Sequence, residues 1–177
     1  VIIVPIGVAR PGFDAEYKII YKNKGNQVAN GSISFTFDDS IMDLVSATPV
    51  NDNAAANCLS WNYTNLNPFE TREIDLIFNI NSPMEIPAVN GDDVLDYTAT
   101  IVGATDETPN DNTFTLNQIV VNSYDPNDKT CLEGTTITPS MVGQYVHYVI
   151  RFENTGTFAA QNIVVRDIIN TAKFDID

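Results

Sequence analysis

Apolar residues recur at every second position along most of this chain, and that alternation limits the fold more than any other feature. It is clearest in residues 15–22, 32–37, 74–80 and 97–101. A period of two places one face of an extended strand in a core and the other in solvent. The predicted core-facing residues are Ala15, Tyr17, Ile19, Tyr21, Ile33, Phe35, Phe37, Ile74, Leu76, Phe78, Ile80, Tyr97, Ala99 and Ile101. We find no apolar stripe of helical period, so the sequence predicts an all-β protein.

The spacing of these segments is typical of an immunoglobulin-like antiparallel β-sandwich. Turn formers rich in Gly, Asn, Asp and Pro separate them. We expect the opening residues 1–9 to form the first strand, and about seven or eight strands in all before residue 122. Trp61 lies between apolar neighbours and is predicted to be a core aromatic residue.

The chain also contains an internal repeat. Residues 17–25 read YKIIYKNKG and residues 148–156 read YVIRFENTG, an offset of 131 positions. In both copies an alternating strand ends in Asn-x-Gly, where glycine suits a tight turn. A repeat of this period indicates tandem immunoglobulin-like domains, residues 1–122 and 123–177. The second copy holds only two or three strands and is therefore incomplete. Either further chain completes it, or its strands rest on a partner.

Charge excludes several classes of partner. The chain has 23 acidic and 9 basic residues and a net charge of −14. Such a surface repels nucleic acid and anionic membranes. No apolar run approaches the ~20 residues of a membrane span, so direct membrane insertion is not expected.

The sequence offers no constellation typical of an enzyme. His147 is the one histidine, and no nucleophile elbow or phosphate-binding loop is present. A pair of catalytic carboxylates would need a cleft that a small sandwich rarely supplies. His147 is predicted to be an exposed strand residue, opposite the face of Val146, Tyr148 and Ile150. We predict a non-catalytic chain.

Two acidic segments, residues 106–112 and 125–128, are candidates for calcium binding. Calcium takes six to eight oxygen ligands, and closely spaced Asp and Asn supply several at once. The candidate ligands are Asp106, Asp111, Asp125, Asn127 and Asp128, with Glu107, Asn110 and Asn112 beside them. The arrangement resembles the calcium-stiffened linkers of cadherins. The alternative is that these residues form ordinary turns, in which Asp125 caps a turn and Lys129 partners Asp128.

Cys58 and Cys131 lie 73 residues apart, a spacing that does not suggest a metal site. One prediction is a disulfide between them in an oxidising compartment. The alternative is two unpaired thiols, one in a strand and one in a loop.

Two family resemblances follow from these motifs. The pattern Tyr-x-Ile-x-Tyr/Phe-x-Asn-x-Gly resembles the conserved-repeat and adhesion-related sandwich domains of bacterial surface proteins. SYDPNDKTCLEG followed by YVHYVIRFENTGTFAAQNIVVRDIIN (residues 123–170) resembles a domain that precedes the C-terminal sorting domain of Bacteroidota proteins secreted by the type IX pathway. The resemblance implies an extracellular or outer cell-surface location and a sandwich fold, and it implies no catalysis. Asp39-Ser40-Ile41 resembles the O-glycosylation sites of such exported proteins, which makes Ser40 a candidate; a plain serine at a strand end is the alternative.

We therefore expect a stalk or spacer module of a large secreted or surface protein, joined to other domains of that protein. The alternative is a carbohydrate- or protein-binding accessory domain of a secreted hydrolase. A further possibility is a chain that is cargo of the secretion machinery. Sugar binding needs exposed aromatic side chains, and the candidates are Tyr63, Phe69, Tyr124, Tyr145 and Phe158.

Overall fold

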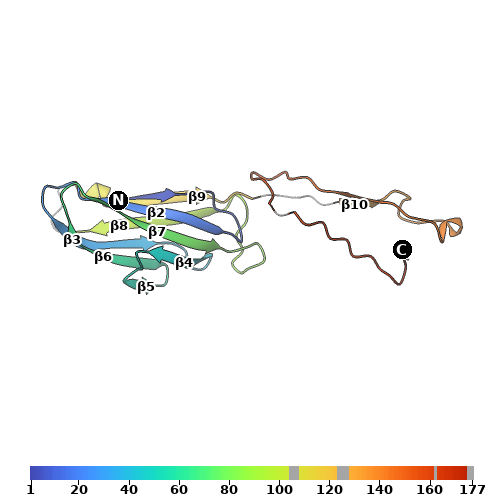
Figure 1. The fold of residues 1–177 in the computed structure, drawn as a ribbon, viewed down its shortest axis with the longest axis horizontal. Helices are drawn as coiled ribbons and strands as arrows, with labels where there is room; N and C mark the ends of the chain where they lie inside the picture. Colours follow the sequence, from blue (N-terminus) through green and yellow to red (C-terminus); the bar gives the residue numbers. More distant parts are fainter. Residues whose placement is uncertain (104–107, 123–127, 162, 175–177) are drawn as a thin grey trace. The chain divides into compact units, whose positions relative to one another are not determined.

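Strands account for nearly all of the regular structure in the computed structural model, which describes residues 1–103, 108–122, 128–161 and 163–174 (Figure 1). Contacts between Cα atoms divide the chain into two compact units, Val1–Asn122 and Ser123–Asp177. Each unit is described by itself below.

Unit 1 is a sandwich of two antiparallel sheets. The four-stranded sheet has the order β1 (Ile2–Pro5), β2 (Asp14–Lys22), β7 (Thr71–Ile80), β4 (Met42–Thr48). The five-stranded sheet has the order β5 (Asn53–Ala55), β6 (Cys58–Leu66), β3 (Ala29–Thr36), β8 (Val94–Val102), β9 (Thr113–Ile119). A short 3-10 turn, η1 (Pro109–Asp111), precedes β9. The split of β1-β2-β7 from β3-β8-β9 is the immunoglobulin-like division of strands between two sheets, so the predicted fold class is confirmed.

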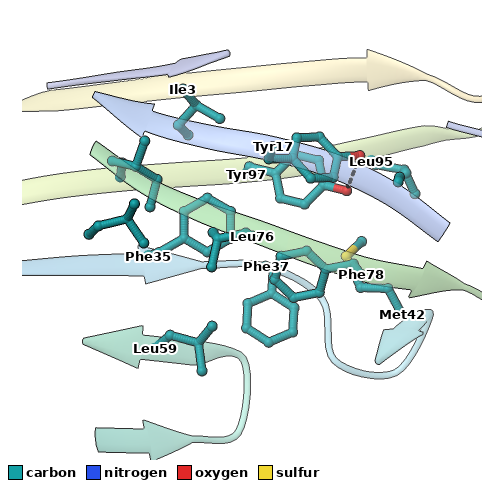
Figure 2. Packing of buried hydrophobic residues seen from close by; sticks show 14 of the residues in the cluster. Ile3, Tyr17, Phe35, Phe37, Met42, Leu59, Leu76, Phe78, Leu95 and Tyr97 are labelled. Carbon is teal, nitrogen blue, oxygen red and sulfur yellow. Dashed lines mark hydrogen bonds between the residues drawn. The ribbon is translucent and has the colours of Figure 1, made fainter. Parts of the chain in front are cut away.

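Alternate side chains of β2, β3, β7 and β8 fill the space between the two sheets. Of the predicted core-facing residues, all but the half-buried Ile101 are buried, and so is Trp61. Figure 2 shows how Phe35, Phe37 and Phe78 pack together between the sheets. The hydroxyl group of Tyr97 on β8 donates to that of Tyr17 on β2 across the core, at 2.7 Å.

Two details of the strand prediction were wrong. The described residues of unit 1 form nine strands rather than seven or eight, because the three-residue β5 is too short to show an alternation. The first strand does not extend over residues 1–9 but ends at Pro5. The chain bends at Ile6 and Gly7, and the following residues leave β2 to run beside β9.

In residues 128–161 and 163–174, unit 2 contains one antiparallel strand pair, β10 (Asp128–Cys131) with β11 (Tyr148–Arg151), and a 3-10 turn, η2 (Pro139–Met141). Cys131 is paired with Tyr148, as Pro5 is paired with Tyr17 in unit 1. Within the part of unit 2 that the structure describes, no side chain is buried.

One hydrogen bond between β1 and β2, and two in the turn after β2, recur at β10–β11 and in the turn after β11. The Ile6 amide donates to the Glu16 carbonyl at 2.9 Å, and the Leu132 amide donates to the His147 carbonyl at 2.8 Å. The side chain of Asn23 accepts from the Gly25 amide and donates to the Gln27 carbonyl, at 2.9 and 2.7 Å. Asn154 makes the same pair of bonds, with the Gly156 amide and the Phe158 carbonyl, at 3.0 and 2.6 Å. The sequence repeat is therefore also a repeat of local structure.

Candidate functional site

In segment 108–112 of unit 1, the side chain of Asp111 forms an ion pair with Lys24. The carboxylate of Asp111 lies 2.6 Å from Lys24 Nζ, which comes from the turn after β2. The carbonyl oxygen of Asp111 accepts a hydrogen bond from the Val1 nitrogen at 3.1 Å. A cation other than Lys24 would have to compete for this carboxylate. Asp106 and Glu107 lie outside the described residues.

In unit 2, Asp128 is paired with Arg151 and not with Lys129. Arg151 Nη1 lies 3.0 Å from Asp128 Oδ2 across the β10–β11 pair, and Thr130 Oγ1 donates to the same carboxylate. Lys129 instead contacts Asp167 at 2.6 Å. Neighbouring side chains of a strand point to opposite faces, which is why the predicted Asp128–Lys129 pair does not form. Asp125 and Asn127 lie outside the described residues.

No group of three or more His, Cys, Asp or Glu side chains that could hold a metal ion occurs in the described part of the chain. This statement does not cover Asp106, Asp125 or Asn127. The predicted calcium site remains a proposal.

Glu133 and His147 form a contact that the sequence analysis missed. His147 Nδ1 lies 2.7 Å from Glu133 Oε1, and the His147 amide donates to Glu133 Oε2 at 2.9 Å. These hydrogen bonds, first that from the His147 side chain, lower the pKa of Glu133 to about 2. His147 is exposed, as predicted, but it precedes β11 by one residue and is not part of a strand. Because 14 residues separate the two side chains, only knowledge of the strand pairing could have indicated this contact.

Both cysteine thiols are free and half-buried. Cys58 begins β6, as expected for a strand, whereas Cys131 ends β10 and was wrongly placed in a loop. The disulfide remains a prediction.

Ser40 is exposed in the turn between β3 and β4, and its hydroxyl group donates to Asp38 Oδ1 at 2.6 Å. Its modification also remains a prediction.

The aromatic candidates for sugar binding differ in exposure. Tyr63 is buried against Tyr21 and was wrongly included, because its strand turns that side chain into the core. Phe69 in unit 1 is 66% exposed and Tyr145 in unit 2 is 82% exposed. Phe158 is half-buried, and Tyr124 lies outside the described residues.

The first residues of unit 1 run alongside its last strand, a contact that we name the terminal seam. It consists of residues 1–9 against residues 111–121. Besides the bond from Val1 to Asp111, the Gln118 side chain donates to the Gly7 carbonyl at 2.9 Å. The Val121 amide donates to the Ala9 carbonyl, also at 2.9 Å. Residue numbers rise together on both sides of the terminal seam, so the two segments run parallel.

An open groove of about 410 Å³ lies where the terminal seam begins. Its lining includes Val1, Ile20, Lys22 and Phe114. Lys24 and Asp111 also line it and are already paired with each other.

None of the helical turns in the described residues is long and apolar enough to cross a membrane.

Comparison with solved structures finds several similar folds. The CARDB domain of a Pyrococcus furiosus protein, crystallised in complex with di-metal ions, has 17% identity and a TM-score of 0.45, covering 68% of this chain and 84% of that one. A Nocardia farcinica protein with an immunoglobulin-like fold has 10% identity and a TM-score of 0.40, covering 66% and 97%. A chain of a complex between a CaDoc0917 variant and CaCohA2 has 15% identity and a TM-score of 0.43, covering 67% and 98%.

No curated protein sequence matches the chain. One family model does match: residues 125–177, which make up most of unit 2, are similar to a domain of unknown function, DUF7619.

Proposed function

We propose that this chain is a non-catalytic spacer module of a large secreted or cell-surface bacterial protein. In this proposal unit 1 is a complete immunoglobulin-like domain, and residues 123–177 are the N-terminal part of a second one. Its partners are the other domains of the same protein, at the outer surface of the cell. The type IX route is a further part of the proposal, supported by the resemblance of residues 123–170.

The observation that carries this proposal is the terminal seam. Because its two segments run parallel, the entry and the exit of unit 1 lie at opposite ends of the sandwich. Tension applied between them therefore shears the seam lengthwise. In shear, the bonds from Gln118 to Gly7 and from Val121 to Ala9 resist together rather than opening one after another. A spacer under tension needs resistance to shear between its entry and its exit, whereas a binding domain that carries no tension does not.

Single-molecule stretching tests the proposal. Unit 1, pulled from its first and last residues, is expected to unfold in one step. The added length should be about 40 nm, since an extended chain spans ~3.3–3.6 Å per residue. Val121→Pro removes the amide that donates to Ala9 and should lower the unfolding force.

The matched control is Ile33→Val, a core change away from the terminal seam that costs about 0.5–1.5 kcal/mol, similar to one lost hydrogen bond. Its unfolding force should fall less than that of Val121→Pro. Equal forces in both variants would show that the seam does not resist the pull.

A carbohydrate-binding accessory domain remains the second candidate, and exposed Phe69 and Tyr145 favour it. The spacer proposal expects no binding of residues 1–177 to a glycan array above background. Saturable binding that Phe69→Ala or Tyr145→Ala removes would establish the accessory domain instead.

A further inference from the structure

Two Asn-Gly pairs occur in the chain, Asn30-Gly31 and Asn90-Gly91. Asparagine is thermolabile because the backbone nitrogen of the next residue can attack its side-chain amide carbon. Glycine has no Cβ, so it permits the close approach that this attack needs. Both asparagines are exposed, so exposure does not decide which of them reacts. The hydrogen bonds and the backbone packing around each pair decide it instead.

Asn30 is held in place by its surroundings. It lies on β3, and its side-chain oxygen accepts a hydrogen bond from the Asn65 amide at 2.7 Å. Gly31 lies so close to the neighbouring strand β8 that an added Cβ would come within 1.9 Å of the Val102 carbonyl oxygen. The Asn30 side chain must therefore leave Asn65, and the strand must open locally, before the Gly31 nitrogen can attack.

Asn90 lies between β7 and β8, just before the turn that leads into β8. Among the residues that the structure describes, neither the Asn90 side-chain amide nor the Gly91 nitrogen has a hydrogen-bond partner. The Asn90 backbone nitrogen, in contrast, donates to Asp93 Oδ2 at 2.7 Å. The backbone at Asn90 is therefore anchored, whereas the two groups that react are free to meet.

We propose that Asn90 is a site of spontaneous deamidation, and that its isoaspartyl product loosens unit 1 where the chain leaves it. The Gly91 nitrogen loses its proton and bonds to Asn90 Cγ, while the bond from Cγ to the side-chain nitrogen breaks and ammonia leaves. Water then opens the resulting succinimide ring at either of its two carbonyl groups. One opening gives an ordinary aspartyl residue, and the other gives an isoaspartyl residue whose backbone runs through Cβ and is one carbon longer. Water is consumed, ammonia is released, and no oxidant or reductant takes part.

The longer backbone falls at a closely packed point. Gly91 lies against Asn122, whose Cβ would be 2.9 Å from a Cβ added to Gly91. The Asp92 amide donates to the Val120 carbonyl at 2.9 Å, and the Val120 amide donates to the Asp93 carbonyl at 2.8 Å. An extra backbone carbon beside Gly91 displaces it against Asn122 and strains these two bonds. Val120 belongs to the terminal seam, so the seam loosens at its exit end as well. This inference does not depend on the spacer function.

Mass spectrometry tests the reaction on the intact 1–177 chain, aged at physiological temperature and then digested at low pH to prevent further conversion. Asn90 should convert at least about tenfold faster than Asn30, because the hydrogen bond and the strand around Asn30 must open first. The rate should rise with pH, since the Gly91 nitrogen attacks without its proton. Asn90→Gln, whose longer side chain would have to form a larger ring, is the matched control and should show no conversion at position 90. Equal rates at the two asparagines, or no isoaspartyl product at position 90, would overturn the proposal.

Hydrogen exchange tests the structural consequence. In the isolated isoaspartyl form, the amides of Asp92 and Val120 should exchange at least about tenfold faster than in the fresh chain. Asn90→Asp carries the same new charge without the extra backbone carbon, so its amides should exchange as they do in the fresh chain. Unchanged exchange in the isoaspartyl form would overturn the loosening of unit 1. Equally fast exchange in Asn90→Asp would assign the effect to charge and would overturn the role of the longer backbone.

Discussion

At the scale of residues, the hydroxyl groups of Tyr17 and Tyr97 make a polar contact across the core of unit 1. Both rings are about 99% buried, and each hydroxyl group has the other as its neighbour at 2.7 Å. Burial raises the pKa of Tyr17 to about 12 and raises that of Tyr97 as well. Both groups therefore stay neutral in the folded state over the physiological range.

Tyr97→Phe should lower the free energy of unfolding by about 1–3 kcal/mol, because it leaves the buried Tyr17 hydroxyl group without its partner. The double variant Tyr17→Phe with Tyr97→Phe should cost less than the sum of the two single changes. Urea unfolding of the four proteins measures both quantities. Strict additivity would show that the two hydroxyl groups are not coupled.

The alternation of residues in the sequence predicted which side chains enter the core, because a strand has only two faces. It could not predict which of these side chains would meet. Tyr17 and Tyr97 are 80 positions apart, and Lys24 and Asp111 are 87 apart. Such pairs depend on how the strands are ordered in the sheets, which local patterning does not encode.

At the scale of elements, the β10–β11 pair is held at its closed end by Glu133 and His147. The ordinary pKa of the Glu133 carboxyl group, 4.5, is lowered to about 2 in the folded state. A group with a lowered pKa stabilises the folded form above its unfolded value, and that stabilisation is lost as the pH falls through the folded value.

The β10–β11 pair should therefore keep its stability above pH 4.5 and lose part of it as the pH falls toward about 2. The Leu132 amide, which donates to His147, is a suitable NMR reporter of hydrogen exchange. Glu133→Gln should remove this part of the acid dependence. An unchanged pH profile in that variant would mean that another group is responsible.

The repeat motif predicted both β2 and β11, and the Asn-x-Gly turns that follow them have the same hydrogen bonds. The strand β2 runs directly into its turn, whereas β11 ends at Arg151, three residues before Asn154. Short or irregular elements were harder to predict. The strand β5 has only three residues, and β1 ends where Pro5 and Gly7 interrupt the apolar run. A period of two needs at least four or five residues before it can be recognised.

At the scale of the whole molecule, the excess of acidic residues sets the response to ions. With a net charge of −14 on 177 residues, the acidic side chains repel one another in the folded state.

The terminal seam joins segments more than a hundred residues apart, so no sequence pattern could have predicted it.

Melting curves should shift upward with sodium chloride, because screening weakens the repulsion. The calcium proposal expects an additional rise at the same ionic strength, since a ligand of the folded state raises the midpoint. Asp111→Ala should abolish that additional rise, whereas Lys24→Ala, which frees the carboxylate, should preserve it. Coincident curves with calcium and with chelator would identify the acidic segments as ordinary turns.

The terminal seam also determines how unit 1 can be re-engineered. Domains usually have neighbouring termini, which is why many tolerate circular permutation. Here the chain enters beside Asp111 and leaves beside Ala9, which pairs with Val121. The ten residue-to-residue steps from Asp111 to Val121 span about 33 Å at ~3.3 Å per step. A permuted unit 1 would therefore need a new linker of roughly ten extended residues lying along the sandwich, and a short Gly-Ser connection between the old termini would break the fold instead of closing it.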